Sequence, residues 1–137
     1  MSSKKKKLKP IPVIHRRLYR LLSEKCLREA NYTCEICGTK KGDLYNGKPQ
    51  RVETHHIMSR NNKNSPLKFD IRNAICLCTR CHKTSRRSAH KHGLWFAKKF
   101  TELRPNDAKW ILDHTDDQVN LKDRKILTKI EENLKQK

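Results

Sequence analysis

The chain has 137 residues, of which 34% are hydrophobic, and its 33 lysines and arginines outnumber 14 aspartates and glutamates for a formal net charge of +19. A chain of this size and polarity is expected to form one domain with a small core, and no apolar run approaches the roughly 18 residues of a membrane span. The excess of positive charge favours nucleic acid as a partner over an acidic protein or a membrane surface. The lysine-rich start lacks the apolar segment of a secretory signal, so we expect a cytoplasmic protein whose cysteines bind metal rather than form disulfides.

The first part of the chain is expected to be a basic, disordered segment over residues 1–14, followed by a helix. The segment contains five lysines, and no acidic residue precedes Glu24. It could pair with phosphates or remain solvated. From about 16 to 30, apolar residues recur at helical spacing, and Cys26 on that apolar face is interpreted as part of the core.

Two C-x-x-C pairs predict a structural metal site. Cys34 and Cys37 form the first pair, and Cys78 and Cys81 form the second. Four thiolates in this pattern suit a closed tetrahedral Zn²⁺ site, and the 40 residues between the pairs must form a structure of their own. Cys76 shares a strand face with Cys78, but Cys78 completes the C-x-x-C spacing, so we interpret Cys76 as a packing residue.

The insert between the two cysteine pairs reads as strand, loop, strand and helix. A short strand is expected over 51–57 and a cationic loop over 58–66. A second strand is expected over 67–77, and a helix from 79 to about 88.

The adjacent pair His55 and His56 carries the most informative chemistry of the insert. In a regular strand the two rings point to opposite faces, so they can serve one reaction only if the strand ends there and the backbone turns. Neutral imidazole is both a metal ligand and a base with an ordinary pKa of about 6.5. The alternative is a pair of satisfied core histidines or a share in the zinc site.

The order of these motifs resembles the HNH endonuclease family. The resemblance rests on C-x-x-C, His-His-Ile, an asparagine and Leu-Cys-x-x-Cys-His, and it covers residues 34–82. It implies an α+β fold with a small ββα-metal core stapled by the four-cysteine zinc site. N- and C-terminal helices would flank this core, giving a nuclease domain over 15–115. The stretch from 88 to 100 is similar to the tail of small bacteriophage HNH proteins.

The resemblance also assigns roles to individual residues. It implies that His55 and His82 bind a catalytic divalent ion and that His56 is the general base. Asn73 would brace the loop behind the histidines through side-chain hydrogen bonds. Some family members have a further metal-binding histidine one helical turn beyond His82, but this chain has Arg86 there, which leaves a third ligand open.

Other polar residues near these motifs are expected to have supporting roles. On a continuous helix His90 would lie about 80° round from His82 and two turns away, so substrate contact or a helix-end role is expected rather than metal ligation. Glu53 shares a strand face with His55 and would either orient its ring or lie on the surface opposite a lysine. Four arginines flank the site and suit phosphates: Arg60, Arg80, Arg86 and Arg87.

An amphipathic, lysine-rich helix is predicted in the last part of the chain, over residues 116–137. Its apolar residues recur at helical intervals. The pattern is compatible with packing on the core, lying on DNA or serving a partner helix.

These features predict a metal-dependent DNA endonuclease that cuts phosphodiester bonds in one or both strands. Zn²⁺ would be structural, and the catalytic ion would be Mg²⁺ or Mn²⁺, with Ni²⁺ or Zn²⁺ as alternatives. The rival interpretations are a non-catalytic, zinc-scaffolded nucleic-acid-binding module and a phage recombination or packaging accessory protein. A resolvase of branched DNA is a narrower alternative within the nuclease class. DNA is the expected partner, and no membrane association is expected. A second copy of the chain in a transient homodimer, or a phage protein, would be a further partner.

Overall fold

Two antiparallel strands, β3 (Val52–His56) and β4 (Ala74–Cys78), form the centre of the structure, a computed structural model that describes residues 7–59 and 64–136. All five residue pairs are in register, from Val52 opposite Cys78 to His56 opposite Ala74. Helix and strand occur together as expected for the α+β class, with the four-cysteine cluster beside the strands. The remaining elements are α1 (Ile11–Glu29), β1 (Leu44–Tyr45), β2 (Lys48–Pro49), the 3₁₀ helix η1 (Ile71–Asn73), the π-helix η2 (Arg80–Thr84), α2 (Gly93–Leu103), α3 (Pro105–His114) and α4 (Arg124–Lys135).

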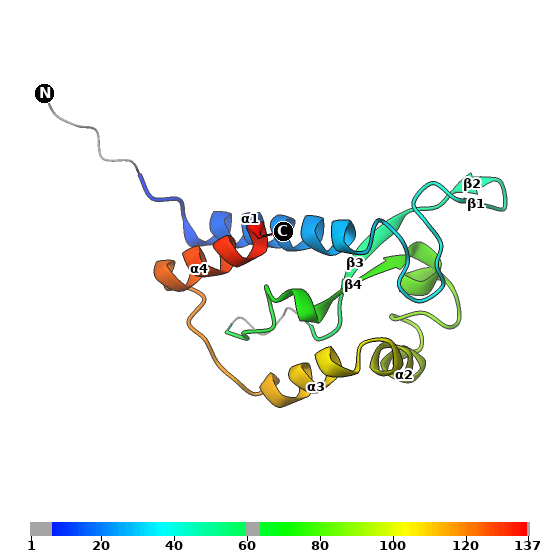
Figure 1. Ribbon diagram of the computed structural model, residues 1–137. Coiled ribbons are helices and arrows are strands. Elements are labelled where there is room, and N and C mark those ends of the chain that lie inside the picture. Colours follow the sequence, from blue (N-terminus) through cyan, green and yellow to red (C-terminus); the bar gives the residue numbers. More distant parts are fainter. Residues whose placement is uncertain (1–6, 60–63, 137) are drawn as a thin grey trace, which may run out of the picture.

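The strand β4 is buried on both faces, because one pair of helices covers each side of the small sheet (Figure 1). Successive residues of β4 alternate between two core clusters, with Ile75 and Leu77 in one and Ala74 and Cys76 in the other. A strand covered on both faces needs an apolar side chain at every position. The first cluster also contains Phe96, Phe100, Ala108 and Ile111 of α2 and α3, and the second contains Leu18, Leu22, Cys26, Leu127 and Leu134 of α1 and α4.

The N-terminal helix α1 begins at Ile11, inside the range 1–14 that was expected to be disordered. Pro10 caps it, and a second proline follows in its first turn, where a missing backbone N–H removes no helical hydrogen bond. Residues 1–6 lie outside the described part of the chain. Within the described ranges, no helix combines the length and the apolarity needed to cross a membrane.

The second strand is shorter than the sequence indicated. Residues 67–73 form turns and η1 instead of extended chain, and Asp70 caps η1 by accepting a hydrogen bond from the backbone N of Arg72 at 2.9 Å. Leu67 and Phe69 are buried, which explains why the segment resembles a strand in sequence. The helix expected over 79–88 is likewise reduced to η2, and residues 60–63 of the expected loop are not among those described.

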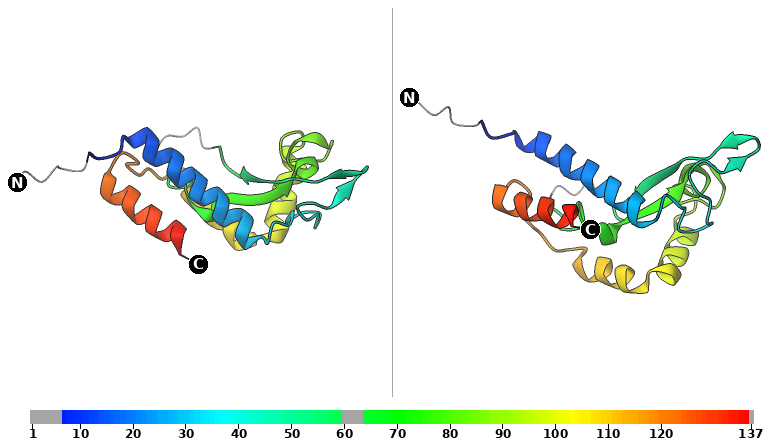
Figure 2. Two further views of the ribbon diagram at one scale, coloured as in Figure 1. Left: turned by 90° about the horizontal axis from the view of Figure 1, so that it is seen from above. Right: turned by 45° about the horizontal axis from the view of Figure 1, so that its top comes forward.

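The C-terminal helix α4 packs against α1, which decides among the three placements compatible with its sequence. The two helices lie side by side in both views of Figure 2 and share the second core cluster. Arg17 and Glu131 form an ion pair at 2.7 Å, and Lys25 Nζ donates to the carbonyl of Gln136 at 2.8 Å. This contact encloses Leu22 between α1, α4 and β4.

Replacing Leu22 by alanine is expected to lower the free energy of unfolding by about 2–5 kcal/mol, because the side chain is fully buried and its removal leaves a cavity. Chemical denaturation followed by circular dichroism measures this loss. Leu112→Ala is the control, since Leu112 is 76% exposed and should change stability by less than about 0.5 kcal/mol. Equal losses in the two variants would contradict the burial argument.

Candidate metal centres and active site

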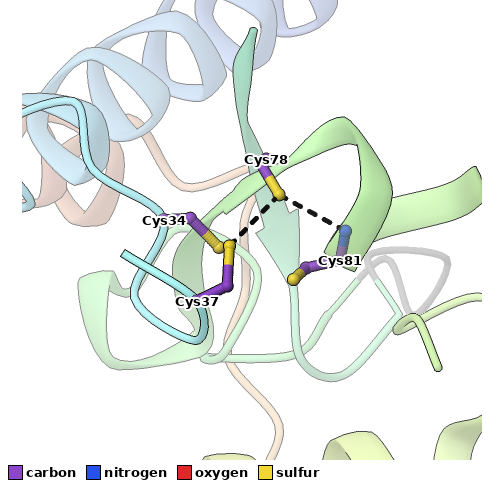
Figure 3. A group of neighbouring side chains, drawn as sticks. All are labelled: Cys34, Cys37, Cys78 and Cys81. Atoms are coloured by element: carbon purple, nitrogen blue, oxygen red, sulfur yellow. Dashed lines mark hydrogen bonds between the residues drawn. The ribbon is translucent and has the colours of Figure 1, made fainter. Parts of the chain in front are cut away.

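Four cysteine sulfur atoms converge where the first cysteine pair meets the end of β4 (Figure 3). Cys34 and Cys37 lie on the loop after α1, Cys78 is the last residue of β4, and Cys81 lies in η2. The four Sγ atoms lie within 4.8 Å of one another, and those of Cys37 and Cys78 are 3.6 Å apart. Sulfur ligands about 2.3 Å from a tetrahedral Zn²⁺ are about 3.8 Å from one another, so the donor set fits this ion.

The charges of this cluster also indicate a cation. A hydrogen bond from Cys81 lowers the pKa of Cys34 to about 4. The same hydrogen bond, together with burial, raises the pKa of Cys81, and burial raises that of Cys78. The thiols of Cys78 and Cys81 are therefore neutral without a cation, whereas a bound Zn²⁺ would stabilise their thiolates.

The backbone holds the cysteine loop rigidly against β4. The N–H of Gly38 donates to the carbonyl of Cys34 at 2.9 Å, and Gly38 adopts a φ of +79°, which suits glycine. The N–H of Glu35 donates to the carbonyl of Cys76, and Glu35 Oε2 accepts from the N–H of Cys76 at 2.7 Å. Arg104 lies between α2 and α3, and its Nη1 is 3.5 Å from Glu35 Oε1.

The remaining two cysteines are packing residues. Cys26 and Cys76 are buried in the second core cluster, whereas Cys34, Cys78 and Cys81 belong to the first. Burial raises the pKa of each thiol to about 12, so both are neutral. The interpretation of Cys76 as a core residue rather than a zinc ligand agrees with this position.

A second cluster combines three histidines from three segments of the chain. His55 lies on β3, His82 in η2 and His90 in the turn before α2, and a ring nitrogen of each lies within 4.8 Å of the others. The Nε2 atoms of His82 and His90 are 3.1 Å apart. Two imidazole ligands about 2.1 Å from one metal ion are about 3.0–3.4 Å apart, so the three rings could hold a divalent ion.

The continuous helix from His82, on which the expectation of a poorly placed His90 was based, is not present. The helix η2 ends at Thr84, and the chain then turns back. The backbone N–H groups of Ala89 and His90 donate to the carbonyls of Cys81 and His82 at 2.8 and 3.1 Å. This reversal brings His90 next to His82, whereas Arg86 is exposed.

Glu53 orients His82 rather than His55. Glu53 Oε2 lies 2.9 Å from His82 Nδ1, and Thr79 donates to the other carboxylate oxygen at 3.0 Å. Burial raises the pKa of Glu53, but the hydrogen bonds from His82 and Thr79 outweigh it and the net shift is downward. With its Nδ1 proton on this carboxylate, His82 presents the lone pair of Nε2 to the cluster.

Two of the three clustered histidines, His55 and His82, have a lowered pKa, which favours the neutral form that binds a metal ion. Burial lowers the pKa of His55 to about 4, and the neighbouring imidazoles add to the shift. Burial also lowers the pKa of His82, while Glu53 opposes the change. Phe96 of α2 packs edge-on against His55 with ring centroids 5.1 Å apart, which supplies part of this apolar environment.

His56 points to the other face of β3 and stacks on Tyr19 of α1. The two rings are 5.1 Å apart and nearly parallel, and the Tyr19 hydroxyl lies 3.5 Å from His56 Nδ1. Because β3 ends at His56, both His55 and His56 nevertheless line one cavity of about 930 Å³. The lining of this cavity also includes His82 and His90, so all four histidines border one space, while the Nε2 atom of His56 itself is buried.

The buried side chain of Asn73 ties together the segments behind the histidines. Its Oδ1 accepts from the N–H of Met58 at 2.8 Å, and its Nδ2 donates to the carbonyls of Met58 and Leu67 at 3.2 Å each. The N–H of Ile57 donates to the Asn73 carbonyl. The bracing contacts expected of this residue are therefore present, and its part in catalysis stays a prediction.

The comparisons with known proteins agree with this geometry. Residues 34–88 match the family model described as HNH endonuclease. This segment is an HNH domain. No curated protein and no solved structure matched the chain. The family assignment indicates a metal-dependent nuclease that acts on nucleic acid.

Two contributors to the candidate site lie outside the matched HNH segment, and the sequence did not reveal them. His90 follows the segment, and its approach to His82 depends on backbone hydrogen bonds rather than on helical spacing. Tyr19 lies on α1, and nothing in its local pattern connects it with His56. Among the arginines expected near the site, Arg80 instead stacks on Tyr45, and Arg60 is outside the described residues.

Cys78→Ala is expected to abolish stoichiometric zinc binding, whereas Cys76→Ala should retain one zinc per chain. The two residues are both fully buried and lie two positions apart on β4, so the variants lose the same side-chain volume. Elemental analysis of purified protein measures the zinc content. Equal zinc loss in both variants would show that Cys76 is a ligand or that packing, rather than ligation, controls zinc binding.

Proposed function

We propose that the protein is a metal-dependent endonuclease that hydrolyses phosphodiester bonds of DNA. The observation that carries the proposal is that His55 and His82 of the HNH segment converge with His90, which follows it, in a group near His56. The net charge of +19 supports a polyanionic substrate. A binding module without catalysis would need the zinc cluster and the positive charge, but not four histidines around one cavity.

The three clustered histidines are proposed to hold the catalytic ion. A divalent ion there would polarise the scissile phosphate and stabilise the leaving 3′ oxygen. Glu53 holds the tautomer of His82 that this role requires, and burial keeps His55 in the neutral form. Mg²⁺ or Mn²⁺ is the proposed physiological ion, with Ni²⁺ or Zn²⁺ as alternatives that also suit imidazole ligands.

His56 is proposed to be the general base that accepts the proton of the attacking water. Its position on the opposite face of β3 from His55 keeps its ring out of the metal cluster. Stacking on Tyr19 supports the ring, and His56 lines the same cavity as the three clustered histidines. Asn73 is proposed to act by holding the backbone at Ile57 and Met58, directly after His56.

A cytoplasmic location, a transient homodimer and a phage protein partner stay predictions from the sequence. The plasmid assay below distinguishes a catalytic nuclease from a protein that only binds DNA.

His56→Ala is expected to reduce plasmid relaxation by at least about 100-fold, since general-base catalysis typically contributes that much or more. Purified wild type and variant are compared on supercoiled DNA with Mg²⁺, Mn²⁺ or Ni²⁺. Zinc content should be the same in both proteins, because His56 is not part of the four-cysteine group. If neither protein cuts DNA with any ion while both bind it, the nuclease proposal fails and the binding module replaces it.

His90→Ala is expected to raise the concentration of divalent ion needed for half-maximal cleavage by at least about tenfold, because one of three imidazole ligands is lost. Titration of cleavage with Mn²⁺ measures this concentration. His92→Asn is the matched control: His92 lies two residues away and caps α2 by accepting from the N–H of Trp95, which asparagine can replace. An unchanged ion requirement in His90→Ala would remove His90 from the proposed ligand set.

A further inference from the structure

A small hairpin extends from the zinc end of the molecule and contributes nothing to the core. It comprises residues 39–51, with β1 paired to β2 across the turn at Asn46 and Gly47. Every residue from 40 to 49 is exposed, and none of the hairpin belongs to either core cluster. The hairpin extends past the rest of the fold in all three views (Figures 1 and 2).

The hairpin is nevertheless well ordered. Asn46 and Gly47 have φ angles of 51° and 76°, which suit the tight turn favoured in two-residue hairpins. At the base, the N–H of Gly42 donates to the carbonyl of Gln50 at 2.9 Å, and the N–H of Gln50 donates to that of Asp43 at 2.7 Å. Ordering so exposed a segment costs conformational entropy without burying apolar surface, which is typical of a binding element.

Arg80 anchors the hairpin to the zinc site. Its guanidinium lies 4.0 Å from the centre of the Tyr45 ring, and its Nη2 donates to Thr39 Oγ1 at 3.1 Å. The same hydroxyl lies 3.1 Å from Cys37 Sγ. The hairpin is therefore held in a definite orientation relative to β3 and β4.

The exposed hairpin is strongly cationic. Asp43 is its only acid, and that carboxylate accepts a hydrogen bond from the backbone N–H of Lys40 at 2.9 Å. The neighbouring segment 79–93, which leads to the histidine cluster, has no acidic residue. The ion pairs found in the described part of the chain involve none of the four hairpin cations, Lys40, Lys41, Lys48 and Arg51.

We propose that this hairpin is a second DNA-contact site, which binds the sugar–phosphate backbone of the duplex at a distance from the scissile phosphate. The proposal rests on the proposed function and adds a separate binding surface to it. β3 leads from the hairpin to the histidines, and its four residue steps from Val52 to His56 span about 13 Å. That length corresponds to about four base pairs of duplex, so a single DNA helix can contact both ends of β3.

The test measures binding without cleavage. In full-length His56→Ala protein, the substitutions Lys40→Gln, Lys48→Gln and Arg51→Gln are combined, and affinity for a fluorescent 30-base-pair duplex is measured by anisotropy over a range of salt concentrations. If each cation contacts one phosphate, the affinity falls about tenfold or more and the slope of log K against log salt decreases by about 2–3. The substituted side chains are exposed, so zinc content and fold are preserved.

A matched triple variant removes the same charge elsewhere. Lys122, Lys125 and Lys129 are exposed and lie on or just before α4, at the opposite side of the molecule from the hairpin (Figure 1). Their replacement by glutamine should weaken binding less than about threefold. Equal losses of affinity in the two triple variants would attribute the effect to net charge and overturn the proposal. A loss of affinity for single-stranded DNA or RNA, with the affinity for duplex DNA unchanged, would also overturn it. Because the assay does not depend on cleavage, its outcome is independent of whether His56→Ala abolishes nuclease activity.

Discussion

The burial of β4 on both faces is the constraint on which the rest of this structure depends. All five side chains are buried, and those from Ala74 to Leu77 alternate between the cluster of α1 with α4 and the cluster of α2 with α3. A strand enclosed in this way cannot slip by one residue, because a slip would move Ile75 and Leu77 into the cluster shaped for Ala74 and Cys76. The register of β3 follows from that of β4, and with it the faces to which His55 and His56 point.

The strand pair therefore separates two adjacent imidazoles into different environments. His55 faces α2 and is surrounded by Phe96, His82 and His90, where burial keeps it neutral. His56 faces α1 and stacks on Tyr19. Two residues of the same type, next to each other in sequence, can in this way take up the different roles of ligand and base.

The sequence predicted the parts of the site that depend on side-chain spacing and missed those that depend on the path of the backbone. The four zinc-site cysteines, the histidine pair and the bracing contacts of Asn73 were all recognisable from residue types and their order. His90 was not, because helical spacing places it far from His82, whereas the actual chain reverses after Thr84. The two strands of the hairpin were not predicted, since two-residue strands leave no periodic pattern.

The same distinction explains the errors in the fold. Leu67 and Phe69 are buried like strand residues, yet they do not extend β4. The cap at Asp70 and the hydrogen bond from Asn73 to the Leu67 carbonyl hold this segment in turns and η1. The apolar stripe of α4 predicted that one face of the helix is buried, but only the tertiary structure identifies α1 as the element that it packs against. An amphipathic pattern specifies a buried face and leaves the covering surface undefined.

The position of the zinc cluster suggests that it organises both the candidate active site and the hairpin. Cys81 directly precedes His82, so a proposed ligand of the structural ion and a proposed ligand of the catalytic ion are neighbours in η2. On the other side, Cys37 contacts Thr39, which receives the hydrogen bond from Arg80 that orients the hairpin. Loss of zinc would thus loosen His82 and the hairpin together, whereas His56 and Asn73, at the opposite end of the strands, would still be held by α1 and by the buried strand β4. A protein with so small a core gains from this arrangement, because a single metal cluster stabilises two separate surfaces that a DNA duplex would contact.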